Sequence, residues 1–311
     1  GRSIEITKGL IHNYRNREYI DQCIGMCKIL PRVEESYDLA IAYSAPVSFA
    51  LYYVAYNIKA NKKWTWIHNE VDQITVDIRD AKNVFKEYNK VFCVSKLAKE
   101  KFDLKLPEYK NKSEVFYNIM DFKLMEEKSK EKIEKSFDAK QYNILTVGRI
   151  CEEKGQDIIP AIALKLKEKE INYKWYLIGE GEFEEKLRKE IKRLQIENYI
   201  ILLGKKLNPY PYFRNCNLYV QTSRQEGYGL TLTEAKYFLK PIISSNTAGA
   251  MEQIVNESNG IITEFGVDQF VEQIISLYHD SEKCKCIEKQ LQKERIKLIE
   301  NKKIEEKLKE I

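Results

Sequence analysis

The sequence has few histidines and no cluster of metal ligands. Three histidines occur in 311 residues, and the seven cysteines are scattered without the spacing of a metal site. Cys23 and Cys27 lie one helical turn apart and Cys284 and Cys286 lie two positions apart, but neither pair has a second pair or a histidine cluster beside it. We therefore expect buried or unreactive thiols in a reducing compartment, with no metal and no bound cofactor.

The sequence also lacks a long apolar run and several diagnostic motifs. The longest apolar run, residues 45–58, is too short to span a bilayer and predicts a buried helix. No secretory signal opens the chain, and no Asp-x-Asp motif occurs. A Gly-x-Gly-x-x-Gly turn with an acidic residue at the required distance is missing, which argues against an NAD-dependent oxidoreductase. We expect a cytoplasmic protein that is soluble or held on the inner face of the cell membrane.

Charge of either sign is in only slight excess. The chain has 52 basic and 47 acidic side chains, for a formal net charge of +5. This is too little for a nucleic-acid-binding field, and it is compatible with an anionic substrate or an anionic leaflet. Several lysines of the first half could rest on such a leaflet or simply form solvated helix faces, and both interpretations stay open. They are Lys59, Lys62, Lys63, Lys96, Lys99, Lys101 and Lys105.

The length suits two domains of ordinary size, and 43% hydrophobic residues can build two cores. Short β-branched runs alternate with longer amphipathic stretches, which is typical of βα units on a mostly parallel sheet. We expect an α/β fold with one domain over 1–138, including a solvated linker helix within 122–140, and a second over 139–311 with a helical tail. The predicted strands are residues 39–43, 64–68, 91–94, 114–117, 143–147, 174–178, 199–203, 218–221, 241–244 and 260–263.

The opening of the first domain is unusual. A Rossmann domain normally begins with an apolar strand, a glycine-containing turn and a helix. Residues 1–30 instead read as helix and loop, and the first strand follows them. We therefore expect the first domain to lack its first βα elements.

The first group of candidate functional residues is VGRICEEKG at 147–155. A strand ends at Val147, and a glycine turn places Arg149 and Lys154 at the carboxyl edge of the sheet, where open α/β sheets bind ligands. Arginine binds phosphate through two parallel hydrogen bonds and lysine adds a mobile charge. The pattern predicts a diphosphate clamp beside a helix N-terminus, although two surface cations flanking a turn fit the spacing equally well.

The second group is EGYGLTLTE at 226–234. Its two glycines allow close approach of the backbone to a ligand and lead into a helix predicted to begin at Leu230. The free N–H groups of residues 230–232 could bind a phosphate. Glu226 precedes the turn and Glu234 lies on the helix, so one carboxylate can face a sugar and the other a ribose diol. The alternative is a helix cap with incidental acidic residues.

The order of these motifs resembles a known family. VGR…KG is followed by NPYPYF, LYVQTSR-x-EG, the Glu-x7-Glu element and KPIISS. The arrangement, from about Tyr37 to Phe265, resembles the family-4 retaining glycosyltransferases of GT-B fold, especially those of bacterial capsule, exopolysaccharide and cell-wall synthesis. The resemblance implies two Rossmann-like domains facing a cleft. The family also has a Gly-rich loop after its first strand, which is not found here.

The resemblance also implies residue roles. Arg149 and Lys154 would neutralise the diphosphate of the donor, Glu226 would contact the transferred sugar and Glu234 the ribose. The loop from Gly204 to Asn208 would border the base. His68, at the end of a predicted strand, would contact the sugar, although a lone histidine is more often structural. The remaining residues predicted at the donor site are Gly148, Gly227, Tyr228, Gly229, Leu230, Thr231 and Leu232.

The reaction implied moves a sugar from a nucleoside-diphosphate sugar, with UDP as the expected carrier, to a glycan or lipid-linked acceptor. The anomeric configuration would be kept, by same-face attack and without a metal. The alternative is a non-catalytic accessory subunit that keeps the fold and binds a partner transferase.

Overall fold

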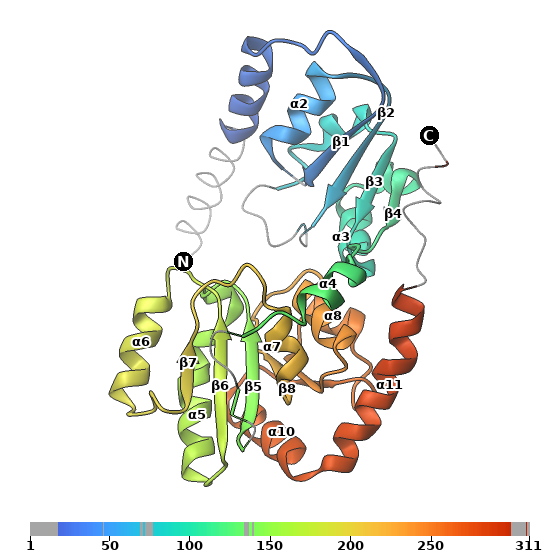
Figure 1. Ribbon diagram of the computed structural model, residues 1–311. Coiled ribbons are helices and arrows are strands. Elements are labelled where there is room, and N and C mark those ends of the chain that lie inside the picture. Colours follow the sequence, from blue (N-terminus) through green and yellow to red (C-terminus); the bar gives the residue numbers. More distant parts are fainter. Residues whose placement is uncertain are drawn as a thin grey trace. The chain divides into compact units, whose positions relative to one another are not determined.

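The computed structural model describes residues 18–45, 47–68, 71, 77–133, 137–138, 140–299 and 309. The chain divides into two compact units, the first reaching to Asn118 and the second running from Ile119 to Asn301. Each unit contains one parallel β-sheet with helices packed on it (Figure 1). The predicted α/β class with parallel sheets is confirmed.

The first unit has a four-stranded sheet in the order β1-β2-β3-β4. The strands are β1 (Ser36–Ala45), β2 (Lys59–Ile67), β3 (Lys90–Cys93) and β4 (Ser113–Val115), each close to a predicted strand. The apolar run forms helix α2 (Phe49–Asn57), which begins where the Ser48 side chain accepts a hydrogen bond from the amide of Leu51. Leu51 and Tyr52 are fully buried in the core of this unit, as the run predicts.

The rest of the first unit is shorter and less regular. Helix α3 (Lys96–Lys105) begins at a Ser95 cap and buries Ala98 and Phe102. The segment between β2 and β3 contains a 3-10 helix, η1 (Lys82–Glu87), and residues 72–76 lie outside the described part. A second 3-10 helix is η2 (Pro107–Lys112). Cys23 and Cys27 are buried in a helix over residues 18–29, as expected.

The second unit has a six-stranded sheet in the order β10-β9-β8-β5-β6-β7. Because β5 pairs with both β6 and β8, the strand order reverses at the centre of the sheet. Such a reversal leaves a crevice at the carboxyl ends of the two central strands, which is where doubly wound sheets bind ligands. The strands are β5 (Tyr142–Val147), β6 (Tyr173–Ile178), β7 (Ile200–Leu202), β8 (Leu218–Gln221), β9 (Ile242–Ser245) and β10 (Ile261–Thr263).

Helices cover both faces of this sheet and bury a core on each. Trp175 and Tyr176 are neighbours on β6 and point to opposite faces, so each belongs to a different core. One core is supplied by helices α5 (Ile159–Glu168), α6 (Glu184–Arg193), α10 (Val267–His279) and α11 (Ser281–Ile299). The other is supplied by α4 (Phe122–Lys128), α7 (Tyr210–Asn215), α8 (Leu230–Tyr237) and α9 (Ala248–Gln253).

Helix α4 corrects one expectation. It was predicted as a solvated linker helix, and its Met125 side chain is in fact buried in the second unit. Phe122 stacks on Tyr237 with ring centroids 4.9 Å apart, and Arg214 donates to Glu126 at 2.8 Å. Four apolar side chains among the charged residues of 122–140 pack in this core, namely Phe122, Met125, Ile133 and Phe137. The compact second unit begins at Ile119, whereas the predicted boundary follows residue 138.

The charged helix α11 is fixed by a polar network as well as by its buried Ile287. Lys236 lies 3.1 Å from a carboxylate oxygen of Glu294, and the Asn259 amide donates to both oxygens at 3.0 and 2.9 Å. Burial alone would raise the pKa of Glu294, but these bonds outweigh it and lower the pKa. Of the described helices, none combines the length and apolar character needed to cross a bilayer.

Candidate functional site

The two predicted groups of residues meet at the carboxyl ends of β5 and β8. These strands pair in register, with Ile144 opposite Leu218. Several hydrogen bonds then join the turns that follow them. Thr222 donates its hydroxyl to the carbonyl of Lys154 at 3.1 Å, and the backbone amides of Arg224 and Gln225 donate to the carbonyl of Glu153 at 2.8 and 3.4 Å. The strand reversal thus brings distant parts of the sequence into one site.

Lys154 and Glu226 form the central contact of this site. The ammonium nitrogen Nζ lies 2.7 Å from Oε2 of Glu226, and the two side chains are only 22% and 16% exposed. A charge-assisted hydrogen bond of this length and burial holds both groups in one orientation. The sequence assigned these residues to separate parts of a donor, and the structure shows that they touch. A ligand bound here would meet both the cation and the carboxylate.

Arg149 is held by its backbone and presents its side chain to solvent. Its carbonyl accepts a hydrogen bond from the Gln156 amide at 2.9 Å. Its guanidinium is 63% exposed and lies 3.2 Å from Glu153. An exposed pair of this kind contributes little to stability, so an anionic ligand can replace Glu153 at small cost. Gly148, just before it, continues the sheet by donating its amide to the carbonyl of Ile178 at 2.9 Å.

Helix α8 begins at Leu230, as predicted, and Gly229 makes the turn into it with φ of +83°. No side chain caps the helix, and the amides of Leu230 and Thr231 come before the first amide that donates within it. The expectation of a free amide at Leu232 is wrong, because that amide donates to the carbonyl of Gly229 at 3.0 Å. The Leu232 side chain is buried in a core. The predicted phosphate site therefore narrows to the first two amides.

The neighbouring side chains support this turn. The Thr231 hydroxyl donates to Oε1 of Gln221 on β8 at 2.9 Å. The Gln253 amide donates to the carbonyl of Tyr228, and also to that of Gly229 at 3.1 Å. Gly227, in the same turn, is half-buried. Gln221 and Gln253 were not among the predicted site residues, because a glutamine at a strand or helix end belongs to no recognisable sequence pattern.

Glu234 lies half-buried on α8, and its carboxylate makes no ion pair or hydrogen bond within the described residues. Burial raises the pKa of Glu234 to about 7. A carboxyl group in this state can accept a hydrogen bond from a ligand hydroxyl when ionised and donate one when protonated. Its predicted contact with a ribose stays a prediction.

The raised pKa of Glu234 makes stability depend on pH. The folded state binds a proton more tightly than the unfolded state, whose carboxyl titrates near 4.5. The contribution is therefore complete below about pH 4.5 and is lost as the pH rises through about 7. We expect the wild type to lose up to roughly 3 kcal/mol more than Glu234→Gln across this interval. Urea unfolding at a series of pH values measures this, and parallel pH profiles of the two proteins would contradict it.

His68 follows β2 in the first unit. Its Nε2 atom lies 2.7 Å from the carbonyl oxygen of Tyr43, and the two rings meet edge to face with centroids 4.6 Å apart. Since a carbonyl only accepts, Nε2 is the donor in this hydrogen bond. The histidine is thus oriented by its neighbour on β1. Its predicted contact with a sugar stays a prediction.

Gly204 follows β7, with φ of +67°. Its carbonyl accepts a hydrogen bond from the amide of Gly179 at 3.0 Å, which ties the carboxyl ends of β6 and β7 together. The loop that begins at Gly204 lies at this end of the sheet. Its predicted position beside a nucleotide base stays a prediction.

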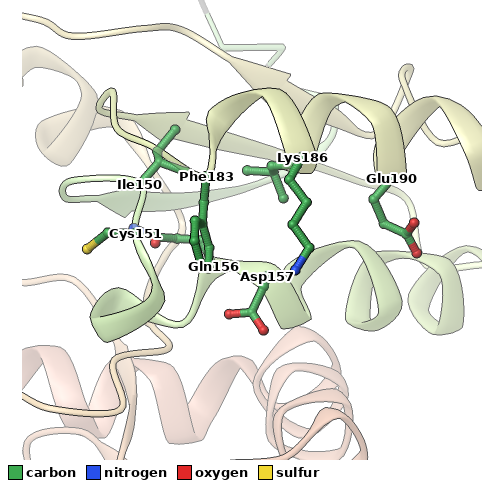
Figure 2. A pocket seen from close by; sticks show the side chains of 8 residues that line it. Ile150, Cys151, Gln156, Asp157, Phe183, Lys186 and Glu190 are labelled. Carbon is green, nitrogen blue, oxygen red and sulfur yellow. The ribbon is translucent and has the colours of Figure 1, made fainter.

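A pocket of about 300 Å³ lies between the start of α5 and helix α6 (Figure 2). Its charged groups already have partners, because Asp157 pairs with Arg224 and Glu190 with Arg193, and Lys186 Nζ lies over the ring of Phe183, 5.3 Å from the centroid. None of the predicted donor residues lines this pocket. Two buried residues of the turn between Arg149 and Lys154 do, namely Ile150 and Cys151. The pocket is lined by Ile150, Cys151, Gln156, Asp157, Phe183, Lys186, Leu187 and Glu190.

Within the described ranges, no three side chains of histidine, cysteine, aspartate or glutamate come together as a metal site requires. Metal independence stays a prediction.

Comparisons with known proteins give relatives of one kind. The chain is 26% identical over 245 residues to an N-acetylgalactosamine-N,N'-diacetylbacillosaminyl-diphospho-undecaprenol 4-alpha-N-acetylgalactosaminyltransferase of Campylobacter jejuni, covering 74% of this chain and 65% of that protein. It is 30% identical over 162 residues to the capsular polysaccharide biosynthesis glycosyltransferase CapM of Staphylococcus aureus, covering 51% and 42%. The chain therefore spans about half the length of the curated relatives that it matches.

Solved structures share the fold. The structure of Anabaena HepE in complex with UDP-glucose superposes with a TM-score of 0.73 at 20% identity, over 88% of this chain and 79% of that one. The sequence profile of the family described as glycosyl transferases group 1 matches residues 127–294, which is more than half of the chain and includes every predicted donor residue except His68. The chain belongs to the glycosyl transferases group 1 family.

Proposed function

We propose that this protein transfers a sugar from a UDP-sugar to a glycan or lipid-linked acceptor in the synthesis of a bacterial surface polysaccharide. The observation that carries the proposal is the Lys154–Glu226 contact of 2.7 Å at the strand reversal, beside the uncapped start of α8. A nucleotide sugar has an anionic diphosphate next to a polyhydroxylated sugar. The site offers a cation, helix amides and a carboxylate within the same few residues, which matches both parts of such a donor.

The diphosphate would lie between the amides of Leu230 and Thr231 and the cations of Arg149 and Lys154. These groups stabilise negative charge as the phosphate leaves, without a metal. Glu226 would accept hydrogen bonds from hydroxyls of the transferred sugar. The leaving phosphate would help to deprotonate the acceptor on the same face, so the anomeric configuration is kept.

The choice of donor and acceptor is supported by relatives. HepE has been crystallised with UDP and with UDP-glucose, which favours UDP as the carrier. The Campylobacter relative is named for a diphospho-undecaprenol-linked acceptor and CapM for capsular polysaccharide. We propose peripheral contact with a membrane as a consequence of a lipid-linked acceptor. The predicted basic surface gives little further support, because Lys63 and Lys99 are already bonded to Ala55 and Asp103 within the first unit.

Binding of nucleoside diphosphates tests this proposal. UDP at a hundred times its dissociation constant is expected to raise the free energy of unfolding by about 2.7 kcal/mol. Equilibrium unfolding with UDP, GDP or ADP measures the effect, and hydrolysis of the matching sugar nucleotides measures turnover. Arg188→Ala is the control, because Arg188 pairs with Glu184 on the surface of α6, and this variant should bind UDP like the wild type. Stabilisation by none of the three would refute the proposal, and binding without turnover would favour an accessory subunit.

A further inference from the structure

Arg224 connects four segments of the second unit. Its guanidinium forms two hydrogen bonds to Asp157, at 2.6 and 2.7 Å, and a third to the carbonyl of Glu152 at 2.7 Å. It also lies over the ring of Phe265, 4.5 Å from the centroid. Its backbone amide donates to the carbonyl of Glu153. Arg224, from the turn after β8, therefore contacts the turn that carries Lys154, the 3-10 turn just before α5 and the segment after β10.

Arg224 forms its hydrogen bonds with the residues that set the position of Lys154. Residues 152 and 153 belong to the 3-10 turn that ends at Lys154, and Arg224 bonds the carbonyls of both. Asp157 follows on the same segment, and Figure 2 shows the Lys186 side chain extending toward it. Arg224 lowers the pKa of Asp157 through these hydrogen bonds, so this carboxylate is ionised at neutral pH. The turn is thus fixed on both sides of Lys154 by one planar cation.

We propose that Arg224 is a positioning residue for the donor site, which sets the Lys154 turn so that the ammonium group meets Glu226. Its effect on donor binding rests on the proposed function, whereas its effect on the turn does not. Lysine cannot replace it, because a single ammonium group cannot make two parallel bonds to Asp157 and also reach the Glu152 carbonyl in the same plane. Displacement of a charged group by about 1 Å can cost on the order of a hundredfold in rate.

The first experiment examines the turn itself in the full chain. The amides of Lys154 and Gly155 are bonded to the carbonyls of Cys151 and Glu152. We expect Arg224→Lys to speed hydrogen exchange of these amides by about tenfold or more. Arg214→Lys is the matched control, since Arg214 also joins two segments by bonding Glu126 and Ser129 but does not reach this turn. Equal exchange in wild type and Arg224→Lys would overturn the proposal.

The second experiment separates positioning from general stabilisation. UDP affinity is measured for Arg224→Lys, Lys154→Ala and the double variant. We expect Arg224→Lys to weaken UDP binding about tenfold in the wild type and to have almost no further effect once Lys154 is absent. A tenfold loss that persists in the Lys154→Ala background would overturn the proposal. If the wild type binds no UDP while the turn exchanges faster in Arg224→Lys, the proposed function fails and the positioning role stands.

Discussion

Lys154→Ala is expected to slow turnover of the sugar nucleotide by about 100- to 1000-fold. The ammonium group is mostly buried and already oriented by Glu226, so it needs no reorganisation when charge develops on the departing diphosphate. Removal of one such preorganised group from a site shielded from water typically has an effect of this size. The variant also leaves Glu226 without its partner, which should further disturb the sugar side of the site.

Steady-state kinetics with the best UDP-sugar, together with an unfolding curve, measure this prediction. Lys165→Ala is the matched control, because Lys165 pairs with Asp268 on the surface of the same unit and lies outside the site. It should keep wild-type turnover and, like most exposed pairs, change stability by less than about 1 kcal/mol. Unchanged turnover in folded Lys154→Ala would refute the role assigned to this lysine.

Gly155→Ala is expected to destabilise the second unit by about 3 kcal/mol or more. Gly155 has φ of +64°, a region that costs other residues about 1–2 kcal/mol. In addition, a Cβ atom there would lie 2.0 Å from the carbonyl oxygen of Thr222 and 2.9 Å from the ring of Phe265. Neither neighbour can yield easily, because the first is backbone and the second packs against Arg224. The turn must move, and Lys154 moves with it.

Gly204→Ala separates the cost of the close contact at Gly155 from the cost of the positive φ. Gly204 has nearly the same φ, +67°, but a Cβ atom there would meet nothing within 4 Å. We expect it to lose only about 1–2 kcal/mol in chemical denaturation. Equal losses in the two variants would mean that the close approach at Gly155 is relieved without cost and that the dihedral angle alone matters.

The strands of the sheet in the second unit could be predicted from the sequence because they are buried on both faces. Runs such as Asn143–Val147 and Lys174–Ile178 are β-branched or aromatic and bounded by turn residues, and they match β5 and β6 to within a residue. The start of α8 was predictable for a local reason as well, since Gly229 must adopt a positive φ just before it. Signals of this kind are complete within a few residues.

The parts that could not be predicted depend on distant partners. Met125 looked solvated because the few apolar side chains of its segment are separated by runs of charge, and only the core of the second unit shows why it is buried. Helices α7 and α9 span six residues each, which is too short for an amphipathic pattern. The contact of Lys154 with Glu226 and the grip of Arg224 on Asp157 join the two turns, and no local rule states that such residues will touch.

The pairing of β5 with β8 also has a consequence for how the site comes into being during folding. Lys154 and Glu226 are 72 positions apart, so their contact closes a long loop that contains β6, β7 and the helices between them. Loops of this length carry a high entropic cost, and contacts of high sequence separation slow folding. Local helices and the β5–β6 pair can form earlier, but they hold only half of the predicted donor-binding groups. Competence to bind a donor should therefore be gained only when the centre of the sheet closes.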